Sequence, residues 1–222
     1  MIPRPSVISS RELSAAEAKW ITLKQIKYVD ADGTERFWEC AERKTRKSSG
    51  VDAVAVLAIL RSKTNAFPLS TVVIEQYRPP IDKFIIELPA AMGKGLVDEK
   101  ETPEQAAIRE LEEETGFTAD KVLQVSSTTV SDPGMTNANM KLVVLDVLLA
   151  DQMETPTQKL ESGEFIVQKV VELAKLNECL QGNIRQFMQA DYAQRGFVVD
   201  ARLSHFATGY DMALQLNQTI YT

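Results

Sequence analysis

The sequence is poor in histidine and cysteine, and this argues against several kinds of site. His205 is the one histidine among 222 residues, which argues against a histidine-based triad and against a metal site built from several histidines. Two cysteines, Cys40 and Cys179, allow at most one disulfide and do not make the framework of a secreted domain. We therefore expect both thiols to be reduced.

Long apolar runs and excess positive charge are also absent. No run approaches the roughly 20 apolar residues of a membrane helix, and the first residues lack the apolar core of a signal peptide. The net charge of −6 argues against a nucleic-acid polymer as partner, because phosphate backbones require a basic surface. We expect a cytoplasmic protein, with a nuclear location as the alternative, that binds neither a nucleic-acid polymer nor a membrane. A small phosphate ester is compatible with this charge if a few arginines act locally.

The chain is long and apolar enough for one large domain or for one domain with an added module, since 44% of its residues are hydrophobic. Runs typical of strands alternate with helical patterns, and no repeat or low-complexity tract interrupts them. This order predicts an α+β fold. Strands are expected at residues 20–29, 35–45, 51–60, 71–77, 84–90, 121–130, 140–149 and 165–171, and helices at 102–116, 173–193 and from Asp200 onward.

The helix at residues 102–116 has unusually clear ends. Thr102, Pro103 and Gln105 have the chemistry of a capped start, and Gly116 is suited to a left-handed end. An apolar stripe between them predicts a buried face, made by Ala107, Ile108 and Leu111.

The opposite face of this helix concentrates negative charge. Glu110, Glu113 and Glu114 lie three and four residues apart near the negative end of the helix dipole, where like charges repel. A hard divalent cation such as Mg²⁺ would relieve that repulsion, since it takes oxygen ligands from a few carboxylates. The alternative is a solvated acidic face on which Arg109 pairs with Glu112 or Glu113.

The full spacing around this helix favours the metal site. Gly95, then Glu101, then Arg109-Glu110-Leu111, Glu113-Glu114 and finally Gly116-Phe117 match every fixed position of the Nudix box. The chain therefore resembles the Nudix hydrolases, which bind Mg²⁺ and cleave a diphosphate linked to another group. The resemblance implies a Nudix α/β/α sandwich with a mixed sheet, preceded here by an antiparallel β hairpin module.

The N-terminal region resembles one branch of that family, the ADP-ribose/ADP-sugar pyrophosphatases, in the segments AKWITLKQIKYVDADG and RFWECAERKTR. The resemblance implies that Trp20 and Trp38 stack on adenine from different subunits of a swapped homodimer. From the residues alone, half-buried packing is the more usual role of a tryptophan flanked by charges. The implied domains are 1–48, for dimerisation and adenine stacking, and 49–222, for catalysis.

Further site residues follow from the same resemblance. Arg43 and the Arg78 of EQYRPP would grip the diphosphate, a task suited to a planar bidentate donor. Taken alone, Arg78 is also compatible with a solvated strand end and the Asp132 loop with a surface turn. The remaining implied substrate contacts are Glu39, Glu87, Leu96, Asp132 and Met135.

The resemblance also implies the metal and catalytic residues. Two or three Mg²⁺ ions, with Mn²⁺ as the alternative, would bind Glu110, Glu114, Glu164 and the backbone carbonyl of Ala90. Glu164 of the Gly-Glu-Phe motif would be the general base, with Glu113 as a rival that assists, and Arg109 would orient the glutamates. This chain departs from the family pattern in one place, where four residues, 91–94, separate Ala90 from the box glycine.

The implied reaction is hydrolysis of ADP-ribose or a related ADP-sugar to AMP and a sugar phosphate. Two alternatives remain. The enzyme would instead prefer oxidised nucleoside diphosphates or UDP-sugars, because stacking on tryptophan tolerates any base. Otherwise the domain is a sensor that binds ADP-ribose without cleaving it, although the intact box argues against this.

Overall fold

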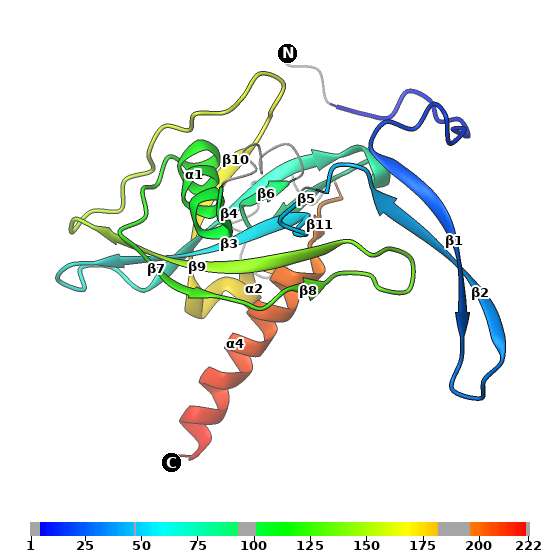
Figure 1. Cartoon of the computed structure of the whole chain (residues 1–222). Coiled ribbons are helices and arrows are strands. Elements are labelled where there is room, and N and C mark those ends of the chain that lie inside the picture. The colour runs from blue at the N-terminus through cyan, green and yellow to red at the C-terminus, as the bar shows by residue number, and fades with distance from the viewer. Residues whose placement is uncertain (1–4, 47, 93–100, 182–195, 221–222) are drawn as a thin grey trace.

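A computed structural model describes residues 5–46, 48–92, 101–181 and 196–220 (Figure 1). Two strands, β1 (Ile21–Val29) and β2 (Glu35–Arg43), form a separate sheet. The other described elements are β3 (Ala53–Ser62), β4 (Ser70–Arg78), η1 (Pro79–Ile81), β5 (Lys83–Glu87), β6 (Ala90–Met92), α1 (Pro103–Thr115), β7 (Lys121–Val125), β8 (Thr129–Val130), β9 (Asn139–Leu149), β10 (Val167–Glu172), η2 (Leu173–Lys175), α2 (Leu176–Leu180), β11 (Val198–Val199) and α4 (Ala201–Ile220).

The predicted N-terminal hairpin is confirmed. Strands β1 and β2 pair antiparallel from Ile21 opposite Arg43 to Val29 opposite Glu35. The carboxylate of Asp30 closes the turn by accepting hydrogen bonds from the backbone N–H groups of Asp32 and Thr34. The hairpin projects from the rest of the molecule in Figure 1. The boundary at residue 48 between two domains stays a prediction.

The larger sheet is mixed. Its main path runs β11-β5-β4-β3-β9-β7, with β10 on β4, β6 on β3 and β8 on β9. Strand β3 is parallel to β9 and β5 is parallel to β11, whereas the other described pairs are antiparallel. The predicted fold class, an α+β fold with a mixed sheet and a hairpin, is confirmed.

Helices cover both faces of this sheet, as Figure 1 shows. Helix α1 packs through Ala106, Ala107 and Leu111 on an apolar core with the inner residues of β3, β4 and β9. On the other face, α2 and α4 pack through residues such as Leu176 and Leu203. The sandwich therefore fixes α1 rigidly against the sheet.

The ends of α1 are where the sequence places them. Thr102 and Gln105 form a reciprocal capping box, and Gly116 adopts a left-handed φ of 73°. The segment just before Glu164 supplies the rest of the C-terminal cap, because Lys159 N–H donates to Glu113 O (2.8 Å) and Gln158 Nε2 donates to Glu114 O (2.5 Å). These bonds satisfy carbonyls that a helix end leaves without partners.

Three expected elements differ in extent. The strand expected at 84–90 is interrupted at residues 88 and 89, where Pro89 has no N–H for a ladder and its carbonyl instead accepts from Val56 N. The strand expected at 121–130 is two strands, β7 and β8. Of the helix expected at 173–193, η2 and α2 are described as far as Leu180, and most of the remainder lies outside the described residues.

The C-terminal helix and the scarce residues agree with expectation. Asp200 accepts the N–H of Arg202 (2.9 Å) and of Leu203 (3.3 Å), which caps the start of α4, and His205 is exposed. Cys40 and Cys179 are buried free thiols. In the described residues, no helix combines the length and the apolar character required to cross a bilayer.

Gly116 offers a stability test. A Cβ there would lie 2.5 Å from Thr157 O and 2.8 Å from Pro156 Cβ, whereas at Gly33, with a similar φ of 78°, it would meet nothing within 4 Å. Gly33→Ala should lower the free energy of unfolding by about 1 kcal/mol from left-handed strain alone, and Gly116→Ala by about 3 kcal/mol, since overlap adds to strain. Urea unfolding of both variants measures this; equal losses would contradict the packing described.

Candidate active site

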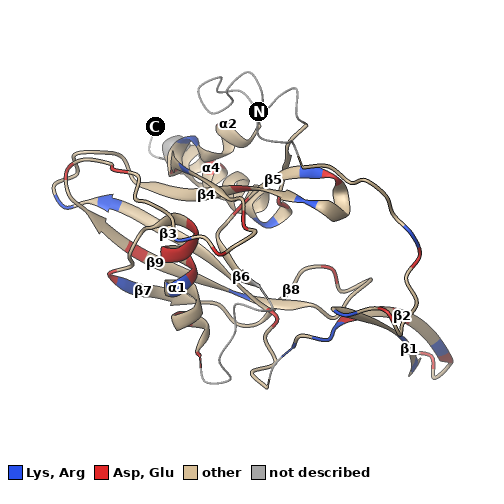
Figure 2. Cartoon of the chain, turned by 90° about the horizontal axis from the view of Figure 1, so that it is seen from above, with Lys and Arg blue, Asp and Glu red and all other residues tan. Residues whose placement is uncertain are grey.

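Two carboxylates of α1 are buried beside the start of β6. Glu110 is 9% exposed and Glu114 is 5% exposed. The expected division into a buried apolar face and an opposite acidic face is therefore wrong for these two residues, which are buried on the same helix face as Ala107 and Leu111. The backbone N–H of Ala90 donates to Glu114 Oε2 over 3.0 Å, so the predicted metal ligands Ala90 and Glu114 are brought together. Figure 2 shows the acidic residues gathered along α1.

The pKa values of both carboxylates are raised. Burial, and next the negative charge of Glu110, raise the pKa of Glu114 from 4.5 to about 8, although the Ala90 N–H opposes the rise. Burial likewise raises the pKa of Glu110, against the effect of Arg109. A cation between them would remove the repulsion, because each oxygen would then face positive charge.

Arg109 holds three carboxylates in place. Its Nε donates to Glu101 (3.0 Å), and its Nη1 donates to Glu110 (2.9 Å) and to Glu113 (2.8 Å). Glu112, on the outer face, pairs instead with Lys159. Arg109 is therefore placed to orient the glutamates, as the resemblance implies, and it also forms the ion pair with Glu113 that the alternative interpretation expected.

Glu164 lies on the exposed loop before β10. Its Oε2 accepts the backbone N–H of Glu161 over 3.0 Å. Its negative charge contributes to the raised pKa values of both Glu110 and Glu114, which places it on their side of the sheet. Glu110, Glu114 and Glu164 do not, however, form a group of three side chains placed to hold a metal ion among the described residues.

The donor set suits a hard cation. Glu110 and Glu114 present buried carboxylate oxygens, the ligand type that Mg²⁺ prefers. Within the part of the chain that the structure describes, no group of three or more acidic, cysteine or histidine side chains is placed to hold a metal ion. A cation at Glu110 and Glu114 would therefore need further ligands from the backbone, water or substrate.

Arg78 and Glu87 lie together at the end of β4 and β5. Arg78 Nε donates to Glu87 Oε1 over 2.9 Å, and its Nη2 lies 2.6 Å from the same oxygen. Burial raises the pKa of Glu87, with Arg78 opposing the rise. Because Glu87 also adds to the raised pKa of Glu114, this pair borders the carboxylates of α1.

The two tryptophans predicted to contact the substrate, Trp20 and Trp38, lie far apart along the hairpin of one chain. Trp20 is 55% exposed and Trp38 is 50% exposed. Trp20 O accepts from Lys44 N, whereas Trp38 is opposite Ile26, so six residue steps, or roughly 20 Å, separate the two tryptophans along the hairpin. One chain does not bring both indoles onto one base.

Arg43 and Glu39 lie on β2, between Trp38 and the end of the hairpin. Arg43 is half-buried opposite Ile21, and Glu39 is exposed opposite Gln25. No described contact joins either residue to the carboxylates of α1.

The loop that carries Asp132 and Met135 contacts the hairpin. Trp38 Nε1 donates to Gly134 O over 2.9 Å, and Ala41 N–H donates to Met135 O over 3.0 Å. Met135 itself is 62% exposed. Leu96 lies outside the described residues. So do residues 93–95, which end the insertion and begin the box.

Sequence reasoning missed three residues that organise this region. Arg46 and Asp52 form an ion pair where the hairpin joins β3, and Gln158 ties α1 to the strand after Glu164 by donating also to Ile166 O (3.1 Å). Each acts through contacts with residues distant in sequence, so no local pattern identifies it.

The raised pKa of Glu114 makes stability depend on pH. Glu114 binds its proton more tightly when folded, so its contribution to the stability of metal-free protein is fully present below pH 4.5 and falls by roughly 5 kcal/mol as pH rises through about 8. Glu114→Gln should remove this decline, and Glu112→Gln should retain it. Urea unfolding in a chelator across this pH range measures both. An unchanged decline in Glu114→Gln would show that Glu114 is not the titrating group.

Comparison with known proteins agrees with this geometry. The NUDIX domain family matches residues 51–190. An uncharacterized Nudix hydrolase of Schizosaccharomyces pombe is 41% identical over 213 residues, covering 96% of both chains. The ADP-ribose pyrophosphatase of Saccharomyces cerevisiae is 38% identical, over 94% of this chain and 85% of its own, and the ADP-sugar pyrophosphatase of Mus musculus is 32% identical, over 90% and 85%.

A solved structure described as an ADP compounds hydrolase shares the fold. It superimposes with a TM-score of 0.51 at 18% identity and covers 86% of each chain. The resemblance seen in the box is thereby confirmed across the sheet and its helices. With a family match over more than half of its length and relatives that cover nearly all of it, this chain belongs to the Nudix hydrolases.

Proposed function

We propose that this enzyme hydrolyses the diphosphate of ADP-ribose, or of a related ADP-sugar, to AMP and a sugar phosphate in a Mg²⁺-dependent reaction. The observation that carries the proposal is the pair of buried, mutually repelling carboxylates, Glu110 and Glu114, held by Ala90 and Arg109. The relatives named ADP-ribose pyrophosphatase and ADP-sugar pyrophosphatase, which align over 90% or more of the chain, support the substrate class.

Glu110, Glu114, Glu164 and the Ala90 carbonyl would hold two or three Mg²⁺ ions, with Mn²⁺ as the alternative. When bound, such ions lower the pKa of water and offset the charge of the diphosphate. Arg109 keeps Glu110 in position through its 2.9 Å bond. Glu164 takes the proton of the attacking water, since it lies on a loop that can approach substrate, whereas Glu113 is held by Arg109.

Substrate recognition divides between the two sheets. Arg78 binds the diphosphate, with Glu87 fixing its guanidinium plane, and Arg43 adds a second cation from the hairpin. Trp20 and Trp38 stack on the base. Asp132 and Met135 meet the ribose end from the loop that contacts β2, and Glu39 and Leu96 complete the proposed contacts.

The active form is a homodimer. The hairpin exposes an apolar surface that one chain leaves uncovered, including Leu23 (76%), Val29 (62%) and Phe37 (61%). Trp20 and Trp38 lie roughly 20 Å apart in one hairpin. A base that stacks between both tryptophans must therefore contact one from each of two chains. A partner hairpin satisfies both conditions, and adenine then stacks between Trp20 of one protomer and Trp38 of the other.

A panel of diphosphates tests the reaction. With Mg²⁺, ADP-ribose and ADP-sugars should release AMP faster than UDP-sugars or oxidised nucleoside diphosphates release their monophosphates. Glu114→Gln should lower kcat by at least about a thousandfold with the fold intact, because it removes a carboxylate that acts on the transition state. Glu112→Gln, two residues away but paired with Lys159, should keep wild-type activity.

The three functional hypotheses predict different results. Preference for another base or sugar reverses the order within the panel. A sensor binds ADP-ribose in a titration but releases no AMP at any Mg²⁺ concentration. Equal activity of Glu114→Gln and Glu112→Gln would exclude Glu114 from the mechanism.

Subunit mixing tests the shared site. Trp20→Ala and Trp38→Ala should each raise KM strongly. Random reassembly of the two variants should restore up to about a quarter of the wild-type sites, because half of the dimers are mixed and one of their two sites keeps both tryptophans.

Wild-type protein should also sediment at twice the 24.7 kDa of one chain. No recovery on mixing, or a monomer, would contradict the shared site.

A further inference from the structure

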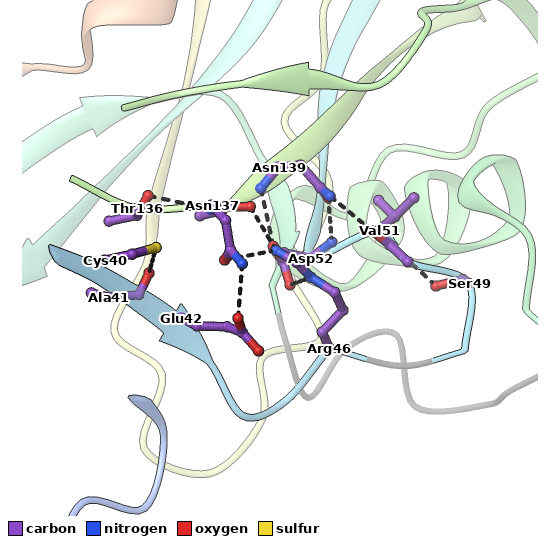
Figure 3. Close-up of polar contacts among 12 residues, drawn as sticks. Cys40, Ala41, Glu42, Arg46, Ser49, Val51, Asp52, Thr136, Asn137 and Asn139 are labelled. Atoms are coloured by element: carbon purple, nitrogen blue, oxygen red, sulfur yellow. Dashed lines mark hydrogen bonds and ion pairs between the residues drawn. The ribbon is translucent and has the colours of Figure 1, made fainter. Parts of the chain in front are cut away.

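Three parts of the chain meet at one partly buried ion pair (Figure 3). Arg46 lies just after the hairpin, Asp52 lies just before β3, and Asn137 ends the loop that carries Asp132 and Met135. Arg46 Nε donates to Asp52 Oδ1 over 2.9 Å, and Arg46 Nη2 donates to Asp52 Oδ2 over 2.5 Å. The same Nη2 donates to the backbone carbonyl of Asn137 over 2.6 Å.

Asp52 is the fixed end of this arrangement. It is 3% exposed and also accepts the backbone N–H of Asn139 (3.0 Å), while its own N–H donates to Asn139 Oδ1 (3.0 Å). The carboxylate therefore joins the starts of β3 and β9, two central strands of the large sheet. A bidentate arginine on such an anchor has one orientation, which sets where its remaining N–H groups point.

From Arg46, the contacts lead to the predicted base-binding residues. Asn137 Nδ2 donates to Glu42 of β2 (2.9 Å), so the loop and the hairpin are also joined beside the pair. Further along the same loop, Met135 O accepts Ala41 N–H, and Gly134 O accepts Trp38 Nε1. The orientation of the Trp38 indole thus depends on a loop whose end Arg46 holds.

We propose that the Arg46–Asp52 pair is a positioning unit that sets the place of Trp38 and of the 132–137 loop relative to the large sheet. Neither residue touches substrate. The inference rests on the proposed function, because it assigns the base side of that site to the hairpin and this loop. The carboxylates of α1 are held separately, by Ala90 and Arg109.

The separation predicts which kinetic constant changes. Loosening the pair should weaken binding of the base end equally in the ground state and the transition state, which raises KM and leaves kcat close to wild type. Displacing a positioned group by about 1 Å can change a rate or affinity by up to a hundredfold. The pair should therefore influence affinity for ADP-ribose and for AMP.

The test uses a matched pair elsewhere in the sheet. Arg61 and Asp146 form the same bidentate contact (2.5 and 2.7 Å), with Asp146 2% exposed. Arg61 lies near the C-terminal end of β3, whereas Asp52 precedes the start of that strand. The double variant Arg46→Met with Asp52→Asn removes both charges at once, so neither is left buried alone. Arg61→Met with Asp146→Asn is its control, and urea unfolding confirms that both fold.

We expect KM for ADP-ribose to rise roughly ten- to a hundredfold in the Arg46/Asp52 variant, with kcat changed less than about threefold, and neither constant to change in the control. Arg46→Lys, which keeps the charge without the fork, should fall between the variant and wild type. An equal effect of both double variants, or a loss in kcat alone, would overturn the proposal.

A spectroscopic readout does not depend on the substrate. With Trp20→Phe, Trp38 is the one tryptophan. The Arg46/Asp52 variant in this background should shift Trp38 emission to longer wavelength, since the indole loses its fixed contact with Gly134 O, and the Arg61/Asp146 variant should not. If wild type cleaves no ADP-ribose but the shift occurs, the proposed function fails and the positioning role stands. An unchanged spectrum would refute the positioning role.

Discussion

The repulsion between two buried carboxylates, Glu110 and Glu114, is the constraint on which the site depends. Both lie on the buried face of α1 together with Ala106, Ala107 and Leu111, so neither can turn away from the other without removing those apolar residues from the core. Stability alone does not favour this arrangement, since burial raises the pKa of both carboxylates and the charge of Glu110 raises that of Glu114 further. A fold that keeps it has retained strain that a bound cation relieves.

The surrounding structure maintains the repulsion by holding α1 at both ends. The capping box fixes its start, and the 156–159 segment closes its C-terminal carbonyls while crossing directly over Gly116. That segment also leads into the loop of Glu164. The same backbone contacts that stabilise the helix therefore also anchor the segment that precedes Glu164, the proposed general base.

The sequence predicts this helix well because its determinants are local. Thr102, Gln105 and Gly116 act within one turn, and the spacing of the acids identifies the family. The mixed sheet and the hairpin follow from strand runs separated by clear turns. The break at residues 88 and 89 was not anticipated, because Pro89 reads as the end of a strand and its carbonyl contact with Val56 spans the sheet.

Long-range polar contacts account for what the sequence did not reveal. Arg46 occurs in a charged run, RKTRK, where any of four cations is a candidate partner for Asp52 or for phosphate. Only the folded chain brings Asn137, 91 residues away, to its guanidinium. Likewise, the exposed tryptophans give no sign in sequence of their separation along the hairpin, which becomes apparent only from the register of β1 and β2.

Calorimetric titration of the protein with Mg²⁺ at pH 7, in two buffers of different ionisation enthalpy, tests the central claim most directly. Because the pKa of Glu114 is about 8, most molecules hold a proton there at pH 7, and binding should release close to one proton, a release that Glu114→Gln abolishes. Absence of Mg²⁺ binding, or binding whose proton release is the same in Glu114→Gln, would contradict the account.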